Sequence, residues 1–303
     1  MALLAEYFRS TFPSDVVWGL YDGNTECAFE YKDNKFQRFL RFATHDAFAK
    51  SVKIKAPHKV HVGATYVAGT RRIVSSHFVI DIDLSDSPWR PCCTSKKTCC
   101  RLCWPLAVCA VRVLEEALEL ACPGSPRMVV WSGRRGFHLW VKSRRLERLG
   151  DVGRRQFAQW LAAFSGKDSV EIPVLLHTDG LIQKVLPHCM ECMRCMCASP
   201  MDGGAGFFDD RGRLQFAEMV RGGQRPLEQI WAAALEGCDA LEASPVAWAA
   251  TEAAIREGHA LWLHFVAAVL HLTWPRLDTN VTAQAGHLVK VRAAPLFYSD
   301  GWF

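Results

Sequence analysis

The fold is decided by residues 78–84, which read Phe78-Val79-Ile80-Asp81-Ile82-Asp83-Leu84. Apolar residues with a high preference for strands dominate this stretch, so it predicts a β-strand. Successive side chains of a strand point to opposite faces. Ile80, Ile82 and Leu84 therefore share one face, and the carboxylates of Asp81 and Asp83 lie side by side on the other.

Two neighbouring carboxylates repel each other, so we expect a cation between Asp81 and Asp83. Hard oxygen ligands suit Mg²⁺ or Mn²⁺, and two such ions about 3.5–4 Å apart would stabilise the attacking and leaving oxygens of a nucleotidyl transfer. A solvated sheet edge or an arginine-paired acid dyad explains the same motif without a metal. A sugar-nucleotide transferase would also use an Asp-x-Asp motif, so further residues must decide.

A hairpin with a basic turn is expected after this strand. Strands are predicted at 128–131 and 137–141, and the turn between them reads Ser132-Gly133-Arg134-Arg135-Gly136. The glycines let the backbone approach a ligand closely, while both guanidiniums and the imidazole of His138 can donate to phosphate oxygens. The alternative is that the two arginines are merely solvated.

A second acidic strand is predicted at 276–282, after Pro275. In a strand, Arg276, Asp278 and Asn280 would share one face, so this segment can supply a third acid. His287 and Lys290 follow shortly afterwards and add two cationic donors.

The cysteines point to metal rather than to disulfides. Five of the 13 lie between positions 92 and 103, and Cys100-x-x-Cys103 has the spacing of a zinc knuckle. No export signal is recognisable, so a reducing compartment is expected. The preferred ligands of a closed, structural zinc site are Cys92, Cys93, Cys100 and Cys103, with Cys99 as the alternative to Cys100.

A further run of cysteines has two open interpretations. It comprises Cys189, Cys192, Cys195 and Cys197, preceded by His188. These residues form either a second metal site or a set of reduced cysteines packed on a helix.

The whole chain has 303 residues, is 50% hydrophobic and carries a net charge of +5. Its length permits one large domain or two smaller ones, no period of a solenoid recurs, and no apolar run is long enough for a membrane helix. A mild positive charge suits an anionic partner. A short helix is expected at 2–12, a mostly β first third, a helix from Pro105 to before Pro123, and a helical region at 152–272.

Three motifs, in this order, resemble the small catalytic subunit of archaeo-eukaryotic DNA primase. They lie at 78–83, 132–138 and 275–281. The likeness extends to Glu26-Cys27-Ala28-Phe29 with Arg38, to Gly63-Ala64-x-Tyr66, to the cysteine cluster running into Trp104, and to His287-Leu288-Val289-Lys290. It is specifically like the eukaryotic branch, and residues 151–271 resemble that family only in being helical.

The resemblance implies an α+β fold: a mixed-sheet primase catalytic fold with a structural zinc module and an inserted helical subdomain. The catalytic domain would comprise residues 1–150, including the zinc module at 92–103, and residues 272–303, with the helical insert at 151–271. Asp81, Asp83 and Asp278 would hold two catalytic Mg²⁺ or Mn²⁺ ions. The nucleotide contacts would be Ser132, Arg134, Arg135, His138, Asn280, His287 and Lys290, with Glu26 and Arg38 lining the site.

The same resemblance implies a nucleotidyltransferase, a DNA-directed RNA polymerase that makes short RNA primers on single-stranded DNA from NTPs. Expected partners are a large primase subunit with an iron-sulphur domain and a replicative DNA polymerase, together in a primosome. The expected location is the nucleus, or a cytoplasmic replication site if a virus encodes the chain. The alternatives are a primase-polymerase that prefers dNTPs in repair or viral replication, and a non-catalytic zinc protein that binds nucleic acid.

Overall fold

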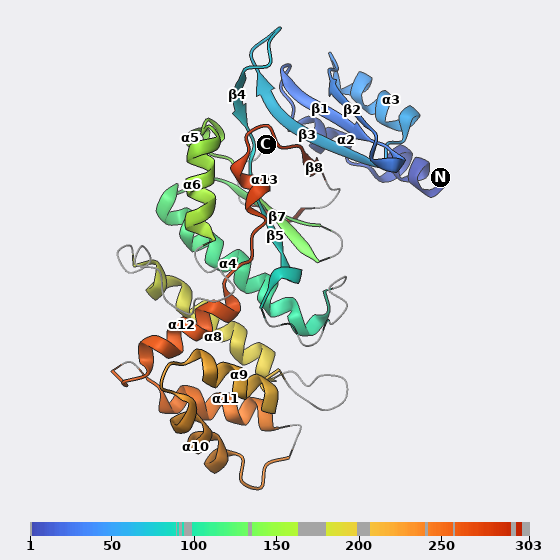
Figure 1. Cartoon of the computed structure of the whole chain (residues 1–303). Coiled ribbons are helices and arrows are strands. Elements are labelled where there is room, and N and C mark those ends of the chain that lie inside the picture. Colours follow the sequence, from blue (N-terminus) through green and yellow to red (C-terminus); the bar gives the residue numbers. More distant parts are fainter. Residues whose placement is uncertain are drawn as a thin grey trace.

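The architecture is α+β, with two antiparallel sheets at one end of the molecule and a group of helices at the other (Figure 1). All strand pairs among the described residues are antiparallel, so the expected mixed sheet is instead two antiparallel sheets. Several neighbouring strands are joined by short turns, which reverse the chain and favour antiparallel pairing. The computed structural model describes residues 2–88, 90, 93, 99–132, 135–162, 180–198, 207–239, 242–256, 258–291 and 295–298.

The first sheet has the order β2 (Phe36–Leu40), β1 (Thr25–Glu30), β3 (Lys59–Tyr66) and β4 (Ile73–Ser76), and the short β8 (Val289–Val291) also pairs with β3. One face of this sheet packs against the N-terminal helices, burying Phe8, Val17, Phe29, Phe48 and Val62 in one cluster. These helices are α1 (Ala2–Glu6), continued by the π-helical turn η1 (Tyr7–Thr11), α2 (Ser14–Trp18) and α3 (His45–Lys55). The helix predicted at 2–12 and the β-rich first third are thus confirmed.

The second sheet has the order β5 (Phe78–Asp83), β7 (Gly136–Val141), β6 (Arg127–Trp131) and β9 (Pro295–Tyr298). Ile80 and Ile82 of β5 are fully buried in the same cluster as the apolar stripe of α4 (Trp104–Ala121). The apolar face of β5 and the predicted helix opening near Pro105 are therefore confirmed. The acids of β5 are left on the opposite face of this sheet.

The remaining helices are α5 (Arg144–Glu147), α6 (Asp151–Leu161), α8 (Leu181–Ala198), α9 (Asp210–Met219), α10 (Gln224–Ala234), α11 (Ala243–Ala254) and α12 (Trp262–Thr273). One hydrophobic cluster runs from β5 and α4 into α8 to α12, where Phe216, Trp248 and Phe265 pack together. The helical region is confirmed, while the boundaries of a separate insert at 151 and 271 stay a prediction. Over the described part of the chain, no helix combines the length and the hydrophobicity that crossing a membrane requires.

The segment after α12 joins the two sheets, but not as the strand predicted at 276–282. Only Leu277 forms an isolated bridge, to Ile82 of β5, and the helix α13 (Thr279–Ala283) begins directly afterwards. The strand prediction was wrong because the carboxylate of Asp278 accepts a hydrogen bond from the amide of Asn280 at 3.1 Å, which starts a helix. Beyond α13 the chain adds β8 to the first sheet and β9 to the second.

Candidate active site

The candidate site contains two acids of β5. Asp81 and Asp83 are partly buried, and their side chains share the face of the second sheet opposite the α4 cluster. Strand β7 runs antiparallel beside them and places His138 opposite Asp81, with its Nε2 atom 3.7 Å from Asp81 Oδ1. The alternation of β5 therefore puts a carboxylate and a buried imidazole next to each other.

The third acid, Asp278, comes from a segment that is distant in the sequence from β5. The backbone amide of Asp278 donates to the carbonyl oxygen of Asp81 at 3.0 Å, and the amide of Asp83 donates to the carbonyl of Arg276 at 3.1 Å. The hydroxyl of Thr282 donates to the carbonyl of Val79 at 2.9 Å, which ties α13 to the same strand. Asp278 is thus fixed directly beside the two acids of β5.

The three carboxylates do not form a compact ligand set. Among the described residues, the only group of three or more His, Cys, Asp or Glu side chains with ligand atoms all within 4.8 Å of one another consists of cysteines. The carboxylates of Asp83 and Asp278 instead accept hydrogen bonds from the protein itself. These hydrogen bonds engage both carboxylate oxygens of Asp83 and the Oδ1 atom of Asp278.

Asp83 is held by Arg135. The guanidinium donates from Nε to Asp83 Oδ1 at 3.0 Å and from Nη2 to Oδ2 at 3.0 Å. Partial burial alone would raise the pKa of Asp83, but the bonds from Arg135 and from the amide of Ser85 hold this pKa below its usual value. Asp83 is therefore ionised at neutral pH. Its pairing with Arg135 is the arrangement expected if the Asp-x-Asp motif contains an arginine-paired acid dyad rather than a metal site.

The turn before β7 is fixed by a close backbone approach. The amide of Gly136 donates to Ser132 Oγ at 3.0 Å, and the amide of Ser132 donates to the carbonyl of Gly136 at 2.8 Å. A Cβ atom at Gly136 would lie 2.4 Å from the carbonyl oxygen of Ile82, so only glycine fits here. This contact keeps Arg135 against β5; Gly133 and Arg134 lie outside the described residues.

Glu26 and Arg38 form a second polar centre, on the first sheet. Arg38 donates from Nε and Nη2 to the two carboxylate oxygens of Glu26, at 2.7 and 3.0 Å, and the Glu26 side chain is completely buried. The hydroxyl of Tyr66 donates to the same carboxylate at 3.1 Å. A Cβ at Gly63 would be 3.0 Å from both Glu26 and Leu288, so the absence of a side chain there admits this arrangement.

A neighbouring buried cluster was not predicted from the sequence. Glu30 accepts hydrogen bonds from Lys59 and, at 2.8 Å, from His61. The sequence signal that could have revealed this cluster is the alternation of side chains along β1 and β3. In the register of these two adjacent strands, Glu30 lies opposite Lys59.

Asn280, His287 and Lys290 all lie on the segment that crosses from the second sheet to the first. Asn280 is exposed in α13, and Lys290 is in β8, directly opposite His61 of β3. Burial lowers the pKa of His287, and the negative charge of Asp278 partly opposes this effect. Asn280 and His287 thus lie near the acids of β5, the first through α13 and the second through its interaction with Asp278, whereas Lys290 belongs to the first sheet together with Glu26 and Arg38.

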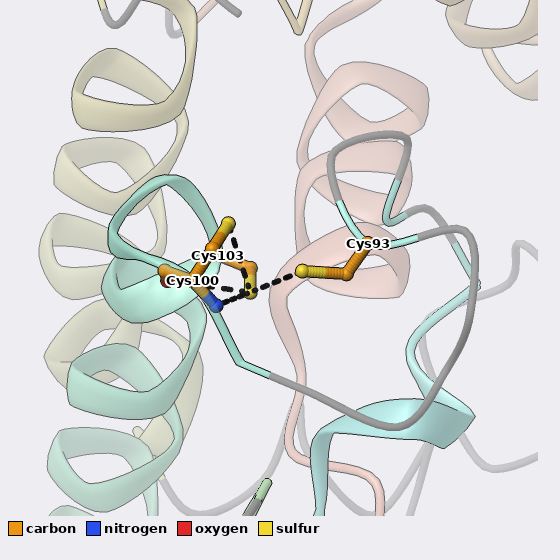
Figure 2. Close-up of side chains that lie close together, drawn as sticks. All are labelled: Cys93, Cys100 and Cys103. Carbon is orange, nitrogen blue, oxygen red and sulfur yellow. Dashed lines mark hydrogen bonds between the residues drawn. The ribbon is translucent and has the colours of Figure 1, made fainter. Parts of the chain in front are cut away.

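The cysteine cluster lies where β5 leads into α4 (Figure 2). The sulfur of Cys103 is 3.8 Å from those of Cys93 and Cys100, and these three side chains turn toward one another. Two sulfurs bound to Zn²⁺ at about 2.3 Å with tetrahedral angles would lie about 3.8 Å apart, so the donor set fits zinc. Cys99 Sγ is 3.6 Å from Cys103 Sγ. Cys92 lies outside the described residues.

The cysteines of α8 are arranged differently. Cys189, Cys192 and Cys197 are buried in the hydrophobic cluster, and the sulfur of Cys189 is 3.9 Å from that of Cys109 in α4. Within the described ranges these residues form no group of three close ligand atoms. The packed-cysteine interpretation is therefore favoured here.

Comparisons with known proteins indicate the family of this chain. A family model described as DNA primase small subunit matches residues 80–293. The DNA primase small subunit of Caenorhabditis elegans is 33% identical over 163 residues, covering 51% of this chain and 40% of that protein. The corresponding subunit of Drosophila melanogaster is 29% identical over 191 residues, covering 55% and 43%.

The chain thus spans about two fifths of the length of these relatives. The family match covers most of the chain and includes the acids of β5, the hairpin of β6 and β7, and Asp278. The chain belongs to the family of DNA primase small subunits.

Proposed function

We propose that this chain synthesises short RNA primers on single-stranded DNA, as the catalytic subunit of a DNA primase. One observation carries the proposal: the backbone hydrogen bond from Asp278 to Asp81 brings a third acid to the Asp-x-Asp strand. A solvated edge has no need of a third acid from a distant segment. Three carboxylates supply oxygen ligands of the kind that hard divalent cations prefer.

Asp81, Asp83 and Asp278 are the proposed ligands of two Mg²⁺ or Mn²⁺ ions. When bound, such ions stabilise negative charge on the attacking 3′-oxygen and on the leaving pyrophosphate. The protein's own contribution is to fix the acids on a rigid strand and on the first residue before a helix. Arg135, which the structure pairs with Asp83, would contribute a guanidinium to a phosphate oxygen of the nucleotide.

The cationic donors around the acids are proposed to bind and orient the triphosphate. Arg135 and His138 come from β7 and the turn before it, and Lys290 comes from β8. The same role is proposed for Ser132, Arg134, Asn280 and His287, while Glu26 and Arg38 line the site from the first sheet. Such groups lower the barrier chiefly by positioning the nucleotide and by stabilising the departing charge.

The cysteine cluster is proposed to hold one structural zinc ion through Cys92, Cys93, Cys100 and Cys103. A closed set of four thiolates leaves no coordination position for a substrate. Its place between β5 and α4 supports a role in fixing the acidic strand to the helix behind it.

The proposed partners follow from the family. A protein named as a small subunit implies a large one, and we propose a large primase subunit with an iron-sulphur domain and a replicative DNA polymerase. Because the relatives belong to eukaryotes, the proposed location is the nucleus.

Primer synthesis on an unprimed homopolymer template tests the proposal. Labelled rNTP or dNTP is supplied with Mg²⁺ or Mn²⁺, with and without a candidate large subunit. We expect RNA products from the wild-type chain and none from Asp81→Asn. Products made only from dNTPs would indicate a primase-polymerase instead, and binding of DNA without any synthesis would indicate a non-catalytic zinc protein.

A further inference from the structure

Phe39, at the end of β2, has a backbone conformation that is rare for an aromatic residue. Its φ is +55°, in the left-handed region that normally favours glycine. Such conformations persist only where surrounding contacts hold them, and they gather at functional sites. Phe39 is not one of the residues proposed above to bind metal or nucleotide.

Two guanidinium groups contact the ring of Phe39. The guanidinium of Arg71 lies 4.2 Å from the ring centre and that of Arg38 lies 5.1 Å from it. The ring of Tyr66 meets Phe39 edge-on at 5.7 Å. The unusual backbone thus directs an aromatic ring away from the core and toward the β3–β4 hairpin, which projects from the end of the first sheet (Figure 1).

This hairpin carries exposed positive charge. Arg71 and Arg72 are both exposed, and within the described part of the chain neither has an acidic partner. Arg38, in contrast, is paired with the buried Glu26. The exposed arginines therefore suit a polyanionic ligand.

Arg38, Phe39, Arg71 and Arg72 form a surface, called the Phe39 surface, that adjoins Glu26, one of the residues proposed to line the active site. Arg38 connects it to Glu26, which lies beside Leu288. On the other side, Ile73 at the start of β4 lies 3.6 Å from the position that a Cβ of Gly286 would occupy. A strand bound across the surface would reach the segment that carries His287.

We propose that the Phe39 surface binds the unpaired DNA template next to the active site. Proteins that bind single strands combine positive charge along the backbone with aromatic or guanidinium planes on which bases stack. Here Phe39 would stack on an unpaired base, with Arg71 moving from the ring to a flanking phosphate and Arg72 contacting another. This inference rests on the proposed primase function, because that function supplies a single-stranded ligand.

Fluorescence anisotropy with labelled oligo-dT, without nucleotide or divalent metal, tests the surface separately from catalysis. Arg71→Glu should weaken binding by about tenfold and reduce the slope of log affinity against log salt by about 0.7 for each phosphate that the variant no longer neutralises. Arg225→Glu, an exposed arginine on α10, is the matched control and should change neither quantity. Equal affinity and slope for Arg71→Glu and Arg225→Glu would overturn the inference.

Phe39→Gly separates stacking from charge, because glycine accepts the positive φ without strain. It should weaken binding of oligo-dT about fivefold or more and leave binding of an abasic oligonucleotide unchanged. Equal losses for both ligands, or a loss confined to primer–template duplex, would overturn the inference. Primer synthesis by the wild-type chain and by Asp81→Asn then tells whether the proposed function itself has failed.

Discussion

Replacing Gly136 with alanine tests how the turn before β7 positions the candidate site. The new Cβ would lie 2.4 Å from the carbonyl oxygen of Ile82, while ordinary contacts of this kind begin near 3.4 Å. The two strands must therefore separate by about 1 Å, since the neighbour is backbone and cannot rotate away. Overpacking of this kind costs about 1–3 kcal/mol, and at about 2–4 °C per kcal/mol the Tm should fall by roughly 2–12 °C.

The same displacement moves Arg135 relative to Asp83, and a shift of about 1 Å can reduce a rate about a hundredfold. Urea and thermal unfolding, followed by primer synthesis, measure both effects in Gly136→Ala. Gly23→Ala is the matched control, because a Cβ at Gly23 meets no atom within 4 Å and the residue has no positive φ. A Gly136→Ala variant with unchanged stability and activity would refute the reasoning.

Three further predictions concern individual interactions. Arg135→Ala should raise the pKa of Asp83, because the hydrogen bonds and the positive charge that lower it are lost. The cost to stability should be no more than about 1 kcal/mol, because the pair is partly exposed. An unchanged pKa in an NMR titration would contradict this prediction. Burial lowers the pKa of His77, so the free energy of unfolding should be highest above about pH 6.5 and should decline as the pH falls below it. Between about pH 7.5 and about pH 5.5, urea unfolding should show a smaller decline for His77→Asn than for the wild type. An equal decline in the two proteins would count against this prediction. Cys103→Ser should lose zinc and Cys192→Ser should retain it, whereas equal zinc contents by atomic emission would argue against the proposed ligands.

Local periodicity was sufficient to predict the elements around the candidate site. The alternation of β5 correctly assigned Ile80 and Ile82 to the core and both acids to the other face. The β6–β7 hairpin and the buried stripe of α4 were likewise predicted, because their patterns depend on neighbours in the sequence.

Such local patterns could not predict contacts between segments that are distant in the sequence. The alternation of 276–282 suited a strand, but the capping bond of Asp278 and the single bridge at Leu277 produced a helix directly after the acid. Arg276, expected on the same face as Asp278, is buried and donates to the carbonyl of His271 at 2.8 Å. Local propensity did not reveal which competing partner each side chain would find.

The pairing of Asp83 with Arg135 shows the same limit. The Asp-x-Asp motif predicts a cation between the acids and leaves both a metal and an arginine as candidates. The structure contains the arginine pair on Asp83, while a metal remains part of the proposed function. Only the turn geometry, fixed at Gly136, brings that guanidinium back over β5.

Binding of Mn²⁺ in the presence of a non-hydrolysable nucleotide tests most directly whether the three acids act as one metal site. Electron paramagnetic resonance counts the bound ions in the wild-type chain, in Asp278→Asn, and in Asp46→Asn as an exposed acidic control on α3. We predict two bound ions for the wild type and for Asp46→Asn. Asp278→Asn should bind fewer ions or bind them more weakly. Equal number and affinity of bound ions in all three proteins would contradict the proposed site.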